Sequence, residues 1–350
     1  MPEKAESRKR ALAGFAIRLV CFTLILSAVL VYGSYVLTPK QEYGICPMTN
    51  LYMQPAGTVD VLVVGTSLAY AGINTNVLWR EYGMATYDLC GAEQPFWETY
   101  YLLREALTLQ HPKLIILETK AACYNKNYSS RARTIQHTFG ILNPIHRIEA
   151  IYGCQEDPRE ALGFVVAYPQ IHNRYSDITW EDFSWPPTNQ GRGSSWNCFI
   201  EDDLVDPHVR PFGYVTVPQV MSRRSQEYVR KMIALAKSED IPILLAVFPN
   251  PHYDTDAAFL DSLWTIANEN KVPYVDYNDQ FFHIVDYATD FADWEHLNVR
   301  GSIKMSLRLG KDINDYYHLP DHRGDPAYAS YDVCADIWYK KLDSFISAPQ

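Results

Sequence analysis

Residues 60–72 read DVLVVGTSLAYAG, an apolar run that ends in a Gly-Thr-Ser turn. The aliphatic residues 61–64 show no polar alternation, which is typical of a strand buried on both faces of a parallel sheet. Ser67 follows this strand, and ligands of open α/β sheets bind beyond the carboxyl ends of the strands. The turn lacks a following Lys, and the region lacks a Gly-x-Gly-x-x-Gly pattern, so a nucleotide-binding loop is disfavoured. Ser67 is therefore a candidate nucleophile, and a purely structural turn is the alternative.

A second polar cluster lies far downstream, at residues 293–298, which read DWEHLN. An Asp and a His three residues apart can point into one pocket from a single loop. His296 would then take the proton of the Ser67 hydroxyl, and Asp293 would orient the imidazole and stabilise its cation. The backbone amides of Ser67 and Gly91 are candidate donors to an oxyanion at adjacent strand ends. Gly91 is equally well explained as a turn glycine that needs positive φ.

The rest of the chain alternates between strand and helix patterns from Asp60 onward. This alternation predicts a parallel sheet with right-handed crossovers, and the expected fold is α/β, a flavodoxin-like three-layer sandwich with about five strands. Asn250 and His252 follow the fourth strand and are candidate substrate contacts, with a Pro-rich turn as the plainer interpretation. The predicted strands are 61–64, 85–89, 113–117, 242–248 and 273–276, and the predicted helices are 74–83, 95–110, 222–237, 256–270 and one that begins near Val299 after Asn298 as its cap.

The Gly65-Thr66-Ser67 turn and the later DWEHLN stretch occur in the order Ser, Asp, His. In this respect the chain resembles the SGNH (GDSL-like) hydrolase superfamily. The resemblance implies that Ser67, His296 and Asp293 are catalytic and that Gly91 is the glycine of the second sequence block. The family's third block has an asparagine that donates to the oxyanion, but this chain has Leu117-Glu118-Thr119-Lys120 at that position. One oxyanion donor is therefore missing, which typically costs on the order of 3 kcal/mol of transition-state stabilisation.

The layout from about residue 8 to 317 resembles a narrower group, the membrane-anchored DltD-like SGNH proteins that accompany membrane-bound O-acyltransferases in Gram-positive envelopes. That resemblance implies ester hydrolysis or acyl transfer, of acetyl or alanyl groups, on a cell-envelope polysaccharide or teichoic acid. It implies a membrane-bound O-acyltransferase as partner and no cofactor. A non-catalytic scaffold on the same fold is the main alternative. A metal site made by Asp293 and His296 with Glu295 or His252 is a weaker one, because no second ligand cluster accompanies it.

The N-terminal region predicts a membrane anchor. A basic tail at 1–18 precedes an uncharged apolar run, predicted to cross the membrane at 19–37, whose first 18 residues span roughly 27 Å at 1.5 Å per residue. No Ala-x-Ala cleavage site follows, and Cys21 lacks a lipoprotein context, so an uncleaved signal anchor is favoured over a cleavable signal peptide. The positive tail predicts a cytoplasmic N-terminus and an extracellular domain.

The remaining boundaries follow from composition. Residues 38–58 read as a linker, 59–317 as the α/β domain and 318–350 as a tail packed on it. Residues 124–220 lack clear periodicity and are rich in Pro, Gly and aromatic residues, so we expect a large irregular insertion that caps the site.

The charge of the chain argues against nucleic acid as a partner. The formal net charge is −10; five of 31 basic and two of 41 acidic residues precede residue 19, which leaves −13 on the remainder. A region with this negative net charge repels the phosphates of nucleic acid. The seven cysteines show no CxxC pair and no zinc-ligand spacing, and mostly free thiols are expected. They are Cys21, Cys46, Cys90, Cys123, Cys154, Cys198 and Cys334.

Overall fold

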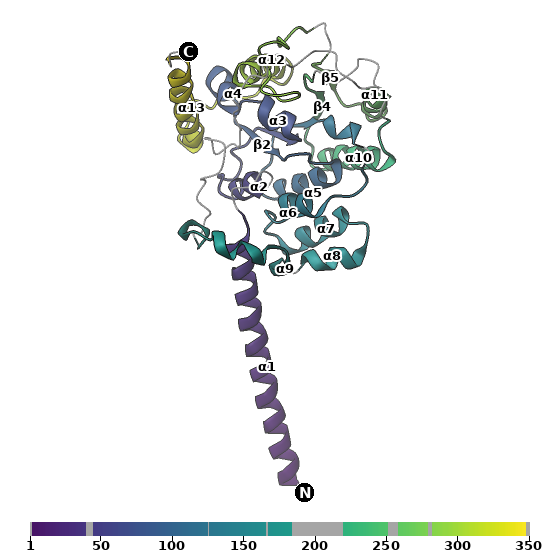
Figure 1. Ribbon diagram of the computed structural model, residues 1–350, viewed down its shortest axis with the longest axis vertical. Helices are drawn as coiled ribbons and strands as arrows, with labels where there is room; N and C mark the ends of the chain where they lie inside the picture. Colours follow the sequence, from purple (N-terminus) through teal and green to yellow (C-terminus); the bar gives the residue numbers. More distant parts are fainter. Residues whose placement is uncertain are drawn as a thin grey trace. The chain divides into compact units, whose positions relative to one another are not determined.

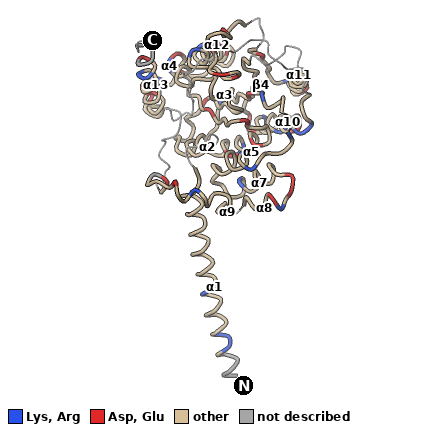
Figure 2. The backbone as a smooth tube through the Cα atoms, in the orientation of Figure 1, with Lys and Arg blue, Asp and Glu red and all other residues tan. Residues whose placement is uncertain are grey.

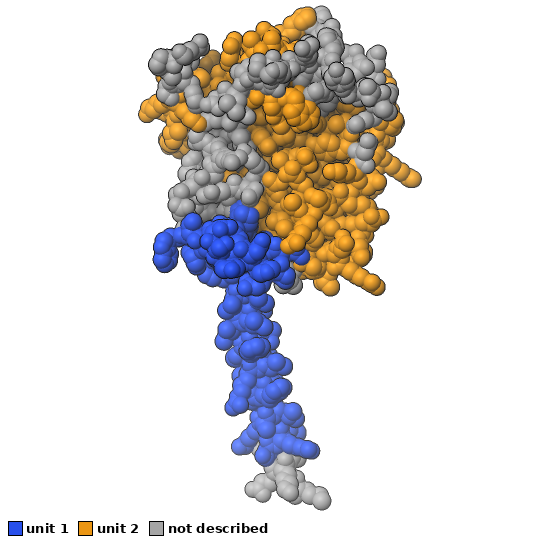
Figure 3. All heavy atoms as spheres, in the orientation of Figure 1, with its two compact units in different colours: residues 1–39, 166–188 blue, residues 40–165, 189–350 orange. Residues whose placement is uncertain are grey.

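The computed structural model describes residues 2–39, 45–124, 126–165, 167–183, 220–250, 258–278 and 282–347. The chain divides into two compact units (Figure 3). The smaller unit contains residues 1–39 and 166–188, and the larger contains residues 40–165 and 189–350.

The larger unit is built on one parallel sheet (Figure 1). Its strands are β1 (Val61–Gly65), β2 (Thr86–Cys90), β3 (Leu114–Glu118), β4 (Ile243–Val247) and β5 (Tyr274–Asp276). They lie in the order β2-β1-β3-β4-β5, and every adjacent pair is parallel. This is the flavodoxin-like strand order, in which the chain reverses its direction of travel across the sheet between β1 and β3. The predicted fold class is therefore confirmed, and β1 and β3 flank the point where the strand order reverses.

Helices cover both faces of this sheet. Leu62 and Val64 point to one side and Val61 and Val63 to the other, as the two-residue repeat of a strand requires. The first side packs on α2 (Ile45–Leu51), α5 (Phe96–Ala106), α10 (Arg223–Ser238) and α11 (Ala258–Asn270), and the second on α3 (Ser67–Gly72), α4 (Thr75–Tyr82) and α12 (Val299–Tyr317).

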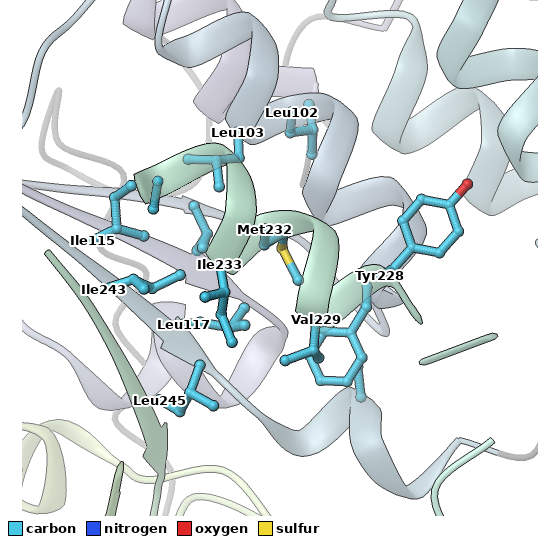
Figure 4. Close-up of a cluster of buried hydrophobic side chains, with 14 of the residues drawn as sticks. Leu102, Leu103, Ile115, Leu117, Tyr228, Val229, Met232, Ile233, Ile243 and Leu245 are labelled. Atoms are coloured by element: carbon cyan, nitrogen blue, oxygen red, sulfur yellow. The ribbon is translucent and has the colours of Figure 1, made fainter. Parts of the chain in front are cut away.

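Figure 4 shows the core between α10, α5 and the sheet. Val229, Met232 and Ile233 recur at helical spacing on the inner face of α10, and they meet Leu117 and Leu245 of the strands (Figure 4). All five side chains are almost fully buried. The contact explains why β3 and β4 tolerate no polar residue on this face.

The helix termini follow from their capping residues. The side chains of Asn74, Ser222 and Asn298 accept backbone hydrogen bonds at the starts of α4, α10 and α12, and Gly83 ends α4 in the left-handed conformation with φ of +67°. The predicted strands and helices are thus confirmed within a few residues. Trp264 of α11 is 58% exposed, although its apolar neighbours Leu263 and Ile266 are buried.

The expected irregular insertion is wrong for residues 131–171. This part contains four helices, α6 (Arg131–Thr138), α7 (Pro144–Cys154), α8 (Pro158–Val165) and α9 (Tyr168–Ile171). The 3₁₀ turn η1 (Lys120–Cys123) precedes it, and η2 (His172–Asp177) and η3 (Trp180–Phe183) follow it. Three of these helices have eight residues or fewer, and α7 leaves Ile145, Ile148 and Tyr152 exposed, so no sustained apolar face marks them in the sequence. In the larger unit, α7 packs on α5, where Gly153 lies against the ring of Tyr101. Residues 184–219 lie outside the described part of the chain.

The predicted linker and tail both contain helices. All residues of α2 are buried, so residues 45–51 belong to the core of the domain and not to a linker. Near the C-terminus, η4 (Pro326–Tyr328) and α13 (Ala329–Ser347) follow α12. Tyr331 of α13 stacks on Trp79 of α4 at a ring distance of 5.1 Å, and His322 lies 2.7 Å from the carboxylate of Asp60.

The smaller unit begins with α1 (Pro2–Leu37), the only helix of the described residues that is long and apolar enough to cross a membrane. Its candidate membrane span runs from Ser7 to Leu37, and the most apolar 18-residue window within it has a mean hydropathy of 2.3. The basic residues of α1 lie towards its N-terminal end (Figure 2). Six of the seven cysteines lie in the described part of the chain, where none of them forms a disulfide bond, and Cys198 lies outside the described residues.

Candidate active site

Ser67 occupies the first position of α3, directly after β1. Thr66 is the N-cap, and its hydroxyl accepts a hydrogen bond from the amide of Leu68 at 3.3 Å. A first-turn amide such as that of Ser67 has no acceptor within its own helix. Ser67 itself is 6% exposed. The turn therefore places the hydroxyl and an amide of the same residue at the carboxyl edge of the sheet.

Glu118 holds this turn in place from the end of β3. Its Oε2 accepts hydrogen bonds from the amide of Thr66 at 2.8 Å and from the hydroxyl of Thr66 at 2.7 Å, while Oε1 accepts from the amide of Lys120. Burial raises the pKa of the Glu118 carboxyl, and these hydrogen bonds together with the charge of Lys120 oppose the rise. Only Gly fits at position 65, since a Cβ there would lie 2.6 Å from the Cβ of Glu118.

Asp293 and His296 form the expected pair. The Asp293 Oδ2 lies 2.7 Å from Nδ1 of His296, and Oδ1 accepts the amides of Glu295 at 2.8 Å and of His296 at 2.7 Å. Burial would raise the pKa of the Asp293 carboxyl, but the hydrogen bonds from His296 and the nearby positive charge of Lys120 outweigh it, so the pKa is lowered. The carboxylate thus stays ionised and fixes Nδ1, which leaves Nε2 as the nitrogen available for proton transfer.

A small hairpin presents this pair to the Ser67 helix. The amide of Ala292 donates to the carbonyl of His296 at 2.8 Å, and Phe291 and Leu297 form an antiparallel bridge. Leu297 packs within the same apolar cluster as Ala69 of α3 and lies 3.6 Å from the position of a Cβ on Gly72. The loop that carries His296 is therefore packed directly on the helix that begins with Ser67.

The last link of the predicted triad is open in this structure. Nε2 of His296 is buried and has no hydrogen-bond partner among the described residues, Ser67 included. The nearest acidic oxygen to Nε2 is Oε1 of Glu295 at 3.9 Å. Catalytic hydrogen bonds are often long or misaligned before substrate binds, so the open link is compatible with a triad.

Gly91 lies at the end of β2, but its amide is already used. It donates to the carbonyl of Gly65 at 3.2 Å, so the amide reaches an oxyanion only by sharing or exchanging this bond. A buried pair, His137 of α6 with Glu98 of α5, lies directly behind Gly91. A Cβ at position 91 would be 2.4 Å from Nε2 of His137, so the close approach requires glycine.

Lys120 is a site residue that the sequence pattern did not single out. It follows β3 in η1, and its ammonium forms an ion pair with Glu295 in which both side chains are 11% exposed. The ammonium also lies 5.6 Å from the ring centre of Trp294. Burial lowers the pKa of Lys120, and the neighbouring acidic groups oppose this. The signal was present: Lys120 lies in the segment that lacks the third-block asparagine, and residues there end at the same sheet edge as Ser67.

Asn250 and His252 were the candidate substrate contacts. Asn250 is buried just after β4, where its backbone amide donates to Oδ1 of Asn278 at 2.7 Å. His252 lies outside the described residues. Among the residues that the structure does describe, no group of three or more His, Cys, Asp and Glu side chains is arranged to hold a metal ion.

No protein-family model and no curated protein matches the sequence. Among solved structures, the chain is similar to a candidate acylhydrolase from Bacteroides fragilis, with 13% identity, a TM-score of 0.39 and coverage of 76% of this chain and 92% of the other. It is also similar to a GDSL-like lipase from Bacteroides thetaiotaomicron, with 12% identity, a TM-score of 0.34 and coverage of 75% and 89%. A gut microbial diltiazem-metabolizing enzyme gives 12% identity, a TM-score of 0.28 and coverage of 74% and 47%. These similarities are weak, so the assignment of the site rests on its own residues.

Proposed function

We propose that this protein is a serine esterase or O-acyltransferase with Ser67 as nucleophile, His296 as base and Asp293 as the residue that orients His296. The observation that carries the proposal is the Asp293–His296 pair, whose Nε2 is left unpartnered on a hairpin packed against the Ser67 helix. A carboxylate on Nδ1 fixes the tautomer that can accept a proton at Nε2.

The proposed reaction passes through an acyl-enzyme. Oγ of Ser67 bonds to the acyl carbon while its proton moves to Nε2 of His296, and the resulting oxyanion collapses as the leaving alcohol takes that proton. Water or an acceptor hydroxyl then attacks the acyl carbon, its proton passes to Nε2, and the proton returns to Oγ as the acyl group leaves Ser67. Hydrolysis and transfer differ only in the second attacking oxygen.

Lys120 supplies a positive charge in place of the neutral hydrogen-bond donor that the missing asparagine would have provided. It emerges from the adjacent strand end, it lowers the pKa of Asp293 through its charge, and its backbone is tied to the Ser67 turn through Glu118. A fixed cation in a site with little water stabilises a developing negative charge effectively. The Glu295 carboxylate keeps the ammonium in position when no substrate is bound.

The substrate proposed is an acyl ester, acetyl or alanyl, on a cell-envelope polysaccharide or teichoic acid, and a membrane-bound O-acyltransferase is the proposed partner. The support is the apolar helix α1 with its basic N-terminal end, which fits a cytoplasmic N-terminus and an external domain, together with the sequence resemblance.

A non-catalytic scaffold for an acyltransferase is the second candidate. One observation favours it: the backbone amide of Gly91, the second candidate oxyanion donor, already donates to the carbonyl of Gly65. A scaffold would keep its cellular function when Ser67 is replaced by Ala, whereas an acyl-enzyme would lose it.

The test is intact-mass analysis of the full chain in detergent after reaction with a serine-directed fluorophosphonate and with p-nitrophenyl acetate. We expect one adduct in the wild type, none in Ser67→Ala and much slower labelling in His296→Ala. Ser238→Ala is the matched control, because Ser238 is exposed at the end of α10, away from the site, and should leave labelling unchanged. Absence of any adduct from the folded wild type would refute the catalytic proposal.

A further inference from the structure

The segment 167–183, here called the juxtamembrane segment, has an unusual surface. Trp180 is 90% exposed and Tyr175 is 73% exposed, and Tyr168 and Phe183 are each 44% exposed. The rings of Trp180 and Phe183 lie 5.9 Å apart, so they form one apolar patch. Large aromatic side chains are rarely left in water together unless they bind something.

The same segment is attached to the end of α1 within the smaller unit (Figure 3). Nη1 of Arg174 donates to the carbonyls of Val36 at 3.1 Å and of Thr38 at 3.4 Å, both at the C-terminal end of the helix. Nη2 of Arg174 donates to Asp182 at 2.9 Å, and Asp182 also accepts the amide of Thr179. These bonds fix η2 and η3 at the last turn of α1.

The length of α1 places that last turn at a membrane surface. From Ala11, after the basic cluster, to its end at Leu37 the helix spans about 40 Å at 1.5 Å per residue. A bilayer with its headgroups is about 40–45 Å thick, so residues near Thr38 leave the membrane at the headgroup level. Tyr35 and Tyr32 lie about one and two turns before this point, where Tyr and Trp are enriched in membrane proteins.

We propose that the juxtamembrane segment binds the lipid–water interface around the point where α1 leaves the bilayer, with Trp180 and Phe183 inserted among the headgroups and upper acyl chains. The occupant of the aromatic patch is therefore the lipid surface. Three features support lipid over a protein partner: the patch continues directly from the apolar surface of α1, its side chains are of the kinds found at membrane interfaces, and the charge of Arg174 is satisfied by Asp182. The inference concerns the membrane surface and is independent of Ser67 chemistry.

The experiment uses the full chain in liposomes of phosphatidylcholine and phosphatidylglycerol, with or without phosphatidylcholine brominated on the upper part of its acyl chains. Bromine quenches Trp fluorescence on contact. Because α1 contains no Trp, quenching reports on the residues outside the helix. Trp180→Phe removes the reporter and keeps an aromatic ring, and Trp264→Phe is the matched control, since Trp264 is 58% exposed on α11 of the other unit.

We expect the brominated lipid to quench wild type and Trp264→Phe, and to quench Trp180→Phe clearly less. Equal quenching of the two variants would overturn the proposal. Absence of lipid-dependent quenching would also overturn it and would point to a protein partner, because the liposomes contain no other protein. Extraction of the chain by alkaline carbonate would show that α1 is not an integral membrane anchor, and this result would also overturn the proposal. Circular dichroism of both variants checks that neither has lost its fold.

Discussion

Substitutions in the ion pair between Lys120 and Glu295 can distinguish a structural role of Lys120 from a catalytic one. Lys120→Met removes one partner of a nearly buried pair and leaves the Glu295 carboxylate uncompensated, with both side chains only 11% exposed. Breaking such a pair costs about 3 kcal/mol of unfolding free energy, slightly more than a hundredfold in the equilibrium constant. Removing both charges, in Lys120→Met with Glu295→Leu, is close to neutral for stability because no carboxylate is stranded.

The double variant should therefore regain most of the lost stability while its esterase activity stays low. Loss of one group that stabilises the oxyanion reduces kcat by on the order of 10²-fold. The assay is urea unfolding of each variant beside the hydrolysis of p-nitrophenyl acetate, with kcat and KM determined separately. If the double variant regains both stability and kcat, Lys120 only neutralises Glu295, and the catalytic role assigned to it is wrong.

Three further predictions concern single residues. Asp293→Asn should lower kcat/KM by on the order of 10³-fold or more, because the amide no longer holds His296 in the reactive tautomer, and unchanged kinetics would exclude the pair as catalytic. Gly91→Ala should destabilise the domain by about 2 kcal/mol, read from urea unfolding, because its Cβ would lie 2.4 Å from His137, and an unchanged midpoint would contradict this packing. Burial raises the pKa of Asp88, and neither of its oxygens has a partner among the described residues, so the folded state holds this proton to higher pH than the unfolded chain. The stability that protonated Asp88 contributes is therefore present at acid pH and is lost as the pH rises above about 4 towards the pKa of the folded state. Asp88→Asn should flatten this decline in unfolding free energy. Parallel stability–pH curves for wild type and variant would refute the prediction.

The fold was predictable because its signals are local. The four aliphatic residues 61–64 and the caps Asn74, Ser222 and Asn298 define their elements without reference to the rest of the chain. The helices α6, α8 and α9 were missed because they have eight residues or fewer, and α7 was missed because several of its apolar residues are exposed and mark no single buried face.

The individual residues of the site were predictable from the sequence, but the contacts between them were not. Ser67, Asp293 and His296 were identified from residue type and spacing, and the Asp293–His296 bond has the expected geometry. Glu118 and Lys120 were quoted only as a departure from a family pattern. Their roles depend on tertiary contacts, with Thr66 and with Glu295, between residues 52 and 175 positions apart in the chain, and no local pattern encodes such contacts.

The hydrogen bonds from Thr66 to Glu118 have a consequence for the order in which the protein is made. The Ser67 turn is shaped by a carboxylate that is synthesised 52 residues after Thr66, and its proposed base follows much later, at His296. A chain that emerges from its N-terminus cannot assemble the nucleophile until nearly the whole domain has appeared. Under the proposed function, Ser67 would therefore stay inert until the segment that carries His296 has also been synthesised and folded.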